Sequence, residues 1–210
     1  MASASSTFTG IETPLSEGGV WTALTAYWQH MTKLNGAKVD ATVLANDCAA
    51  RYTGATFTAD HYAELTLAAV PTGGQLFFHY VLCRMNTTAA CYELTTAPDV
   101  STTTIQLFSL DNSGNGTQIG ANITLGSAMA AGDVMRLECI GTTLNVKYNG
   151  TLVRTATDST LATGQPGIGG WAQNATSNVV LTNLWSAADI VASLGAPSTR
   201  NRTPSYLFAL

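Results

Sequence analysis

Residues 132–171 read GDVMRLECIGTTLNVKYNGTLVRTATDSTLATGQPGIGGW, and their alternation of apolar and polar side chains indicates paired β-strands. In the segment 133–140, apolar residues alternate with charged ones, which is the period of two of a half-buried strand. The segment 143–148 alternates in the same way. Asn149-Gly150 then predicts a tight hairpin to a partner strand at 151–156, because a type I′ turn needs positive φ at both central positions.

Strand signals continue through most of the remaining sequence. Turn residues separate them, notably at 71–74 and 111–116. Many short strands with regular turns predict an all-β sandwich or barrel, and 210 residues suffice for one large sandwich with its own core. Alternating, branched or aromatic residues place the further strands at 60–70, 75–85, 91–95, 103–110, 117–125 and 179–186.

Two segments have the spacing of short helices. Residues 19–34 place Trp21, Leu24 and Trp28 at helical intervals, and residues 187–194 follow the last predicted strand. We therefore expect a β-sandwich that also contains short helical segments.

The two ends differ in composition from the rest of the chain. Residues 1–10 are rich in Ser, Thr and Ala and predict an N-terminal arm, residues 11–190 form the predicted domain, and residues 191–210 form a C-terminal tail. The tail ends in an unusually apolar sequence, and we expect both ends to lie on neighbouring chains. The predicted docking residues of the tail are Tyr206, Leu207, Phe208 and Leu210.

The block 132–171 resembles the concanavalin A-like lectin/glucanase superfamily in its laminin G-like form. Members carry a strand of the kind G-D-x-x-R-L, a strand that ends in N-G, and a later G-x-x-G-I-G. The matching residues here are Gly132, Asp133, Arg136, Leu137, Asn149, Gly150, Asp158, Gly164, Gly167, Ile168 and Gly169. The resemblance implies a two-sheet antiparallel jelly roll over roughly residues 10–190. Forms without a signal peptide resemble domains of bacteriophage structural and tail proteins.

Composition argues against several classes of partner. Only 10% of the residues are charged and the formal net charge is −4, so the scattered Lys and Arg form no basic stripe for nucleic acid. No segment reaches the roughly 18–20 apolar residues of a membrane span. Residues 1–10 lack the features of a secretory signal, which predicts synthesis in a host cytoplasm. A homo-oligomeric protein of the virion surface fits these observations.

Catalysis is not predicted. A glycosidase needs two carboxylates about 5–10 Å apart, and glucanases of the resembled superfamily carry them in a Glu-x-Asp-x-x-Glu run that is absent here. Asp60 and Glu64 come nearest, yet four residues of strand separate them by roughly 13 Å. We therefore predict a protein that is not an enzyme.

One loop has an incomplete calcium pattern. Asp111, Ser113 and Asn115 offer oxygens at alternate positions, as in the first half of an EF-hand loop, but the twelfth position is Asn122 rather than Glu. The pattern favours a plain Gly/Asn hairpin loop and leaves calcium as a weak candidate. No other cofactor is predicted.

Two further features leave alternatives open. Cys83 and Cys91 flank a predicted turn, so either a disulfide or two free thiols is possible, and a reducing site of synthesis favours free thiols. Trp171 follows a turn predicted at Gly169-Gly170. With Gln173 and Asn174 close by, it is either a platform for a sugar ring or a core residue.

The predicted function is that of a non-enzymatic virion surface protein, either a capsid decoration subunit or a head- or tail-fibre attachment subunit. It would act through contacts with other virion proteins. The alternative is a lectin-like module that binds glycans, and a glycoside hydrolase ranks third. Because one fold serves many functions, the site must decide between them.

Overall fold

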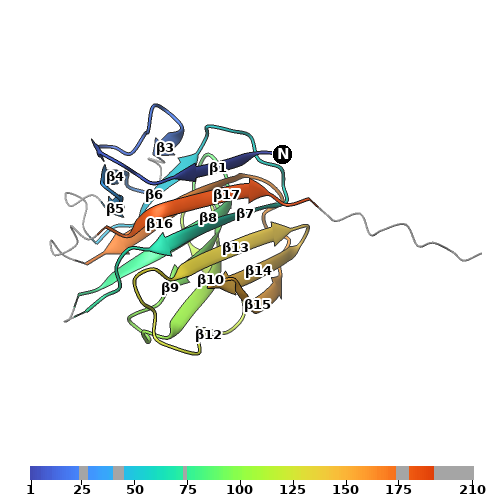
Figure 1. Ribbon diagram of the computed structural model, residues 1–210. Helices are drawn as coiled ribbons and strands as arrows, with labels where there is room; N and C mark the ends of the chain where they lie inside the picture. The colour runs from blue at the N-terminus through green and yellow to red at the C-terminus, as the bar shows by residue number, and fades with distance from the viewer. Residues whose placement is uncertain (24–27, 40–44, 73–74, 174–179, 192–210) are drawn as a thin grey trace, which may run out of the picture.

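The computed structural model describes residues 1–23, 28–39, 45–72, 75–173 and 180–191. In these ranges the chain forms two antiparallel β-sheets that lie face to face, and it forms no helix (Figure 1). The predicted all-β, two-sheet sandwich is confirmed.

The nine-stranded sheet contains the hairpin on which the fold prediction rests. Antiparallel pairing along this sheet brings the last described strand beside strands from the first third of the chain. Its order is β15 (Thr151–Thr157), β14 (Thr143–Tyr148), β13 (Val134–Ile140), β7 (His61–Leu67), β17 (Thr182–Asp189), β5 (Ala37–Val39), β4 (Met31–Leu34) and β2 (Ile11–Glu12), and β1 (Ser3–Ser6) also pairs with β17.

The eight-stranded sheet carries the candidate site. Its central strand, β8, is the longest of the sheet and lies between β9 and β16. Its order is β11 (Gly116–Gln118), β10 (Thr104–Leu110), β9 (Cys91–Thr96), β8 (Phe77–Met85), β16 (Gln165–Ala172), β6 (Cys48–Tyr52) and β3 (Trp21–Ala23), and β12 (Ile123–Thr124) also pairs with β10.

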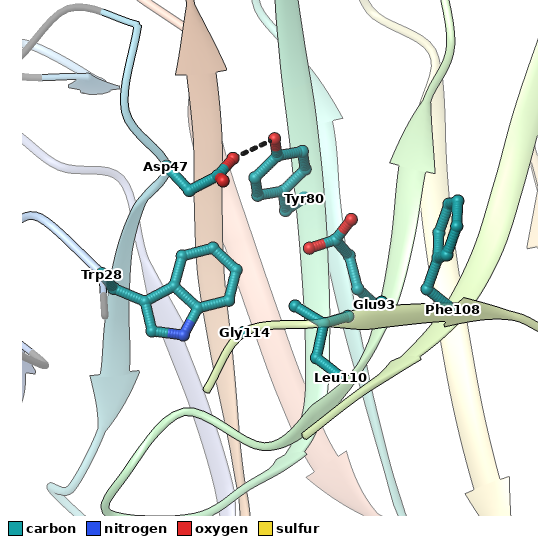
Figure 2. A pocket seen from close by; sticks show the side chains of 8 residues that line it. Trp28, Asp47, Tyr80, Glu93, Phe108, Leu110 and Gly114 are labelled. Carbon is teal, nitrogen blue, oxygen red and sulfur yellow. Dashed lines mark hydrogen bonds between the residues drawn. The ribbon is translucent and has the colours of Figure 1, made fainter. Parts of the chain in front are cut away.

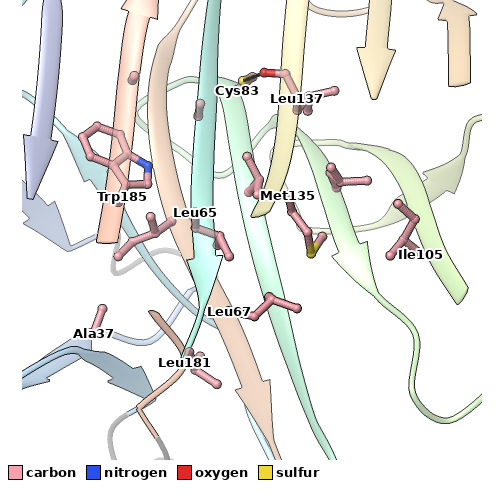
Figure 3. Packing of buried hydrophobic residues seen from close by; sticks show 14 of the residues in the cluster. Ala37, Leu65, Leu67, Cys83, Ile105, Met135, Leu137, Leu181 and Trp185 are labelled. Atoms are coloured by element: carbon pink, nitrogen blue, oxygen red, sulfur yellow. Dashed lines mark hydrogen bonds between the residues drawn. The ribbon is translucent and has the colours of Figure 1, made fainter. Parts of the chain in front are cut away.

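The main core lies between the sheets (Figure 3). Leu65 on β7, Leu137 on β13 and Ile105 on β10 are each no more than 1% exposed. Trp185 on β17 meets Trp21 on β3 edge to face, with ring centroids 4.6 Å apart. Burying each such side chain stabilises the fold by about 1.5–3 kcal/mol before entropy costs, so this layer fixes how the sheets stack.

A second hydrophobic cluster, the outer cluster, covers the other face of the eight-stranded sheet. Because side chains alternate along a strand, β8 sends Phe77 and Val81 into the main core and Phe78 and Tyr80 to the outer face. The buried members are Trp28, Ala49, Tyr80, Leu82, Met85, Ala89, Cys91 and Leu110, and Phe78, Phe108 and Trp171 pack against them.

The predicted hairpin between β14 and β15 is confirmed. Asn149 and Gly150 both have positive φ, 48° and 77°, as a type I′ turn requires. The Asn149 side chain also accepts a hydrogen bond from the Val134 amide at 2.7 Å, which ties the turn to the start of β13. Alternation and the Asn-Gly turn thus predict this hairpin correctly, and a contact with β13 fixes its position in the sheet.

The predicted helix over 19–34 is wrong for the described residues, which form β3 and β4 there; residues 24–27 lie outside the described ranges. The apolar side chains serve two surfaces rather than one helical face. Trp21 lies in the main core and Trp28 in the outer cluster. Among the described residues no helix has the length and apolar character that a membrane crossing requires.

The end of the last strand also differs from the prediction. Residues 187–189, expected to begin a helix, extend β17, where they pair with β7 and, through Ala187 and Ala188, with β1. Residues 192–194 lie outside the described ranges. Pairing with strands on both sides outweighs the helix propensity of Ala187 and Ala188, so propensity did not decide the structure here.

The segment 1–10 is not a free arm. Its residues 3–6 form β1 on β17 of the same chain, and the Ala2 amide donates to the Asp189 carboxylate at 2.6 Å. Backbone pairing thus holds the N-terminal segment on its own sheet. Of the tail over 191–210, the structure describes only Val191, so the four predicted docking residues lie outside the described ranges.

The glycines around Trp171 lie inside β16, where the sequence indicates a turn at Gly169-Gly170. A Cβ at Gly169 would lie 2.7 Å from the Cys48 carbonyl oxygen, and one at Gly170 would collide with the Leu181 side chain. The glycines therefore permit close packing between neighbouring elements and do not reverse the chain.

All four cysteines are buried and free. Cys83 faces the main core, where its Sγ donates to the Leu137 carbonyl at 3.3 Å, whereas Cys91 faces the outer cluster. The two side chains point to opposite faces of the eight-stranded sheet and do not meet. The open alternative is resolved in favour of free thiols.

Candidate functional site

A pocket of about 180 Å³ opens on the outer face of the eight-stranded sheet (Figure 2). Three aromatic rings and two acidic side chains form most of its wall. The lining residues are Trp28, Asp47, Tyr80, Glu93, Phe108, Leu110, Gly114 and Gly116. Pockets of larger ligands usually measure 300–1,000 Å³, so this one suits a single sugar unit or one group of a longer ligand.

Strand register places Glu93 in the pocket. Along β9 the side chains of Tyr92 and Leu94 enter the main core, so Glu93 between them must face outward. Its neighbours in the sheet are Leu82 on β8 and Phe108 on β10. Figure 2 shows its carboxyl between the Tyr80 and Phe108 rings.

The Glu93 carboxyl reaches the pocket and has no hydrogen-bond partner among the described residues. The residue is only 7% exposed, and no described side chain or backbone amide donates a hydrogen bond to its carboxyl. Burial raises the pKa of Glu93 to about 8, and the negative charge of Asp47 adds to the effect. At neutral pH the group is therefore mainly a protonated acid that faces the pocket.

Asp47 and Tyr80 form the opposite wall. The Tyr80 hydroxyl donates to the Asp47 carboxylate at 2.6 Å. The Tyr80 ring meets the Trp28 ring at a centroid distance of 6.1 Å and an angle of 67°. A Cβ at Gly169 would lie 3.0 Å from the Tyr80 ring, so a glycine on β16 leaves room for this packing.

The sequence-predicted sugar platform lies on the same face. Trp171 is half-buried on the outer side of β16, where it packs against Phe78 with ring centroids 5.4 Å apart. It belongs to the outer cluster and not to the main core. Gln173 is exposed just beyond the strand, and Asn174 lies outside the described residues.

The candidate calcium loop is closed on itself. Asp111 accepts hydrogen bonds from the Ser113 amide at 2.8 Å, the Asn115 amide at 2.9 Å and the Asn115 side chain at 2.9 Å. These bonds use both carboxylate oxygens to shape the turn between β10 and β11. Within the described part of the chain, no group of three or more His, Cys, Asp or Glu side chains is placed to hold a metal ion.

Asp60 and Glu64 have separate tasks away from the pocket. Asp60 accepts from the Gly141 amide at 2.8 Å and lies 3.5 Å from the Arg84 guanidinium. Glu64 on the nine-stranded sheet accepts from the Ser186 hydroxyl at 2.8 Å and lies 3.6 Å from Arg136. Both carboxylates are neutralised by structural contacts.

Sequence reasoning missed the pocket's two acids. Asp47 and Glu93 are far apart in the sequence, and only the pairing of β6, β16, β8 and β9 brings them to one face. One local signal was present. Glu93 is the sole charged residue in the stretch CYELTT, which lies in a central strand. Burying a charged side chain there costs free energy, and such a residue is therefore a candidate for a functional role.

No family model matches the sequence, and no curated protein matches it either. Solved structures do match in fold. A carbohydrate-binding module, CBM66 from Bacillus subtilis, aligns with 74% of this chain and 92% of its own at 16% identity and a TM-score of 0.51. The fold is a concanavalin A-like jelly roll.

Two further solved structures share this jelly roll. The β-glucanase of Bacillus licheniformis covers 90% of this chain and 96% of its own, at 13% identity and a TM-score of 0.50. LamA from Z. galactanivorans, solved with laminaritriose and laminaritetraose, covers 88% and 97% at 10% identity and a TM-score of 0.55. At such identities the likeness establishes the jelly roll alone, so the pocket must carry the functional argument.

Proposed function

We propose that this chain is a glycan-binding module that holds a sugar in the outer-face pocket and does not cleave it. The observation that carries the proposal is the Glu93 carboxyl, which is buried, unpartnered among the described residues and turned toward a pocket with aromatic walls. Buried polar groups normally have a hydrogen-bond partner. A ligand hydroxyl would supply the missing one.

The pocket has the chemistry that sugars require. A pyranose presents apolar ring faces and a rim of hydroxyls, which fit an aromatic wall and a small number of fixed polar groups. Phe108 is half-buried and offers a ring face at the rim. Asp47 accepts hydrogen bonds, whereas protonated Glu93 donates one. Trp171, on the same sheet face, extends the surface for a longer oligosaccharide.

The comparisons support this proposal over the predicted function of a virion surface protein. The carbohydrate-binding module shares the fold, although low identity limits that support to architecture. Nothing comparable supports a capsid or tail subunit, and its docking residues lie outside the described ranges. A location on the virion surface and contacts with virion proteins or further copies remain predictions, compatible with a module that binds glycans there.

Glycoside hydrolysis is the second candidate, and one observation favours it. Glu93 is held as a protonated acid at neutral pH near a second carboxylate, Asp47. Glycosidases use such a pair, an acid with raised pKa and a carboxylate. Release of new reducing ends from an oligosaccharide by the native chain, abolished in Glu93→Gln, would identify an enzyme. Tight binding without release would identify the non-catalytic module.

A glycan array followed by calorimetry tests the proposal. We expect the native chain to retain at least one oligosaccharide, and Phe108→Ala to weaken binding about tenfold through loss of a stacking face. Leu152→Ala removes an exposed apolar side chain from β15 on the other sheet and serves as the matched control. Absence of any bound glycan, or equal affinity in the two variants, would overturn the proposal.

A further inference from the structure

We infer that the sugar taken by this pocket carries a free amino group, whose ammonium lies between Glu93 and Asp47 and against the aromatic wall. This inference rests on the proposed glycan site and names its ligand class, a de-N-acetylated amino sugar. Three observations carry it: the charge of the lining, the separation of Glu93 from the described basic side chains, and the rings that surround it.

The pocket lining is acidic only. Asp47 and Glu93 contribute two carboxyl groups, and the described lining contains no Lys, Arg or His. The two acids lie close enough for the charge of Asp47 to act on Glu93. Such a site repels uronic acids and other anionic sugars and attracts a cation.

The Arg51 side chain, on the same face of the sheet, lies well away from Glu93 in the strand register. Arg51 shares its row across the sheet with Gly167, Leu82 and Glu93. Three strand spacings separate Arg51 from Glu93, or roughly 14 Å. The buried carboxyl at Glu93 therefore meets no described countercharge, and a ligand cation would supply one.

The aromatic residues favour the same group. Trp28, Tyr80 and Phe108 line the pocket around the two acids, and Figure 2 shows Tyr80 and Phe108 on either side of the Glu93 carboxyl. Ring faces attract cations, and the attraction grows when water is excluded. The N-acetyl group of an N-acetylated sugar is uncharged and larger than an ammonium group.

When the ammonium binds, Glu93 releases a proton. A cation beside Glu93 favours its ionised form, so the carboxyl releases the proton that it holds in the empty pocket. The titratable groups that face Glu93 are Asp47 before β6, Tyr80 on β8 and Cys91 on β9. Burial raises the pKa of the Cys91 thiol well above its usual range, so this thiol stays neutral throughout.

Calorimetry with two matched sugars tests the inference. The probes are a tetramer of glucosamine and a tetramer of N-acetylglucosamine, and we expect the native chain to bind the first at least tenfold more tightly. Glu93→Gln should reduce that preference to less than threefold. Asp99→Asn removes an exposed acid elsewhere and should keep the preference in full.

The outcomes separate this inference from the function on which it rests. Equal binding of the two tetramers, or binding of neutral glucans alone, overturns the amino-sugar assignment and leaves a glycan-binding module. A lysine-containing peptide that binds as tightly as the glucosamine tetramer overturns the sugar assignment in favour of a protein ligand. If no sugar binds at all, both proposals fail. A folded Glu93→Gln, verified by its melting temperature, makes each comparison valid.

Discussion

The buried carboxyl of Glu93 gives the folded chain a specific dependence of stability on pH. Its pKa is about 8 in the folded state, against 4.5 for an ordinary Glu, because burial disfavours the charged form. Between these values an unfolded chain has released the proton that the folded chain keeps. The contribution of Glu93 to the free energy of unfolding is therefore highest below pH 4.5 and falls as the pH rises to 8.

The magnitude follows from the two pKa values. At pH 7 the folded state is less stable by about 3 kcal/mol than it would be with a neutral group of the same shape. Glu93→Gln supplies that group. We expect the variant to exceed the native chain by about 3 kcal/mol in free energy of unfolding at pH 7, and to equal it near pH 4.

Urea denaturation at several pH values measures this difference directly. The difference between variant and native chain removes the contributions of all other titrating groups, which both share. Asp99→Asn, an exposed site, is expected to change the free energy of unfolding by less than about 0.5 kcal/mol at either pH. Coincident curves at pH 7, or a difference that does not grow from pH 5 to 8, would refute the buried-acid reasoning.

Three further predictions concern the frame around the pocket. Burial lowers the pKa of His79 to about 4, so the free energy of unfolding should fall as the pH drops from 6.5 to 4. His79→Gln should make the free energy of unfolding less dependent on pH in this range. An unchanged pH dependence in the variant would contradict the burial argument. Gly170→Ala should lower stability by about 1–3 kcal/mol in thermal melts because its Cβ collides with Leu181, whereas Gly126→Ala, with open space, should not. Arg84→Met should cost about 3 kcal/mol or more in urea, since the guanidinium donates to three loop carbonyls; a loss below 1 kcal/mol would show that those carbonyls find other donors.

The sequence predicts most of the middle and late strands because their signals are local. The alternation of 143–148 and the turn at Asn149-Gly150 predict β14 and its hairpin from adjacent residues alone. β16 was not predicted because its glycines were interpreted as a turn. Their actual role is to leave room for Leu181, a contact that exists only in the folded chain. The helix expected over 19–34 failed for a related reason in its described residues, since Trp21 and Trp28 face two separate surfaces.

The site was predictable only in part. Trp171 could be picked out as a candidate glycan platform from its local sequence, and it lies on the outer face with the pocket. Asp47 and Glu93 could not be paired, because their proximity depends on the order of four strands across the sheet. A pocket assembled by sheet register therefore leaves little trace in any one stretch of sequence, and here that trace is the lone charge of Glu93 in CYELTT.

Tryptophan indole signals in NMR test the central claim most directly, because the four tryptophans divide evenly between the two faces of the eight-stranded sheet. Trp28 and Trp171 lie in the outer cluster, whereas Trp21 and Trp185 lie in the main core. Titration with a glycan that the chain retains should shift the Trp28 signal and, for longer oligosaccharides, that of Trp171, with the two core signals unmoved. Shifts confined to the core tryptophans, or none at saturation, would contradict a glycan site in this pocket.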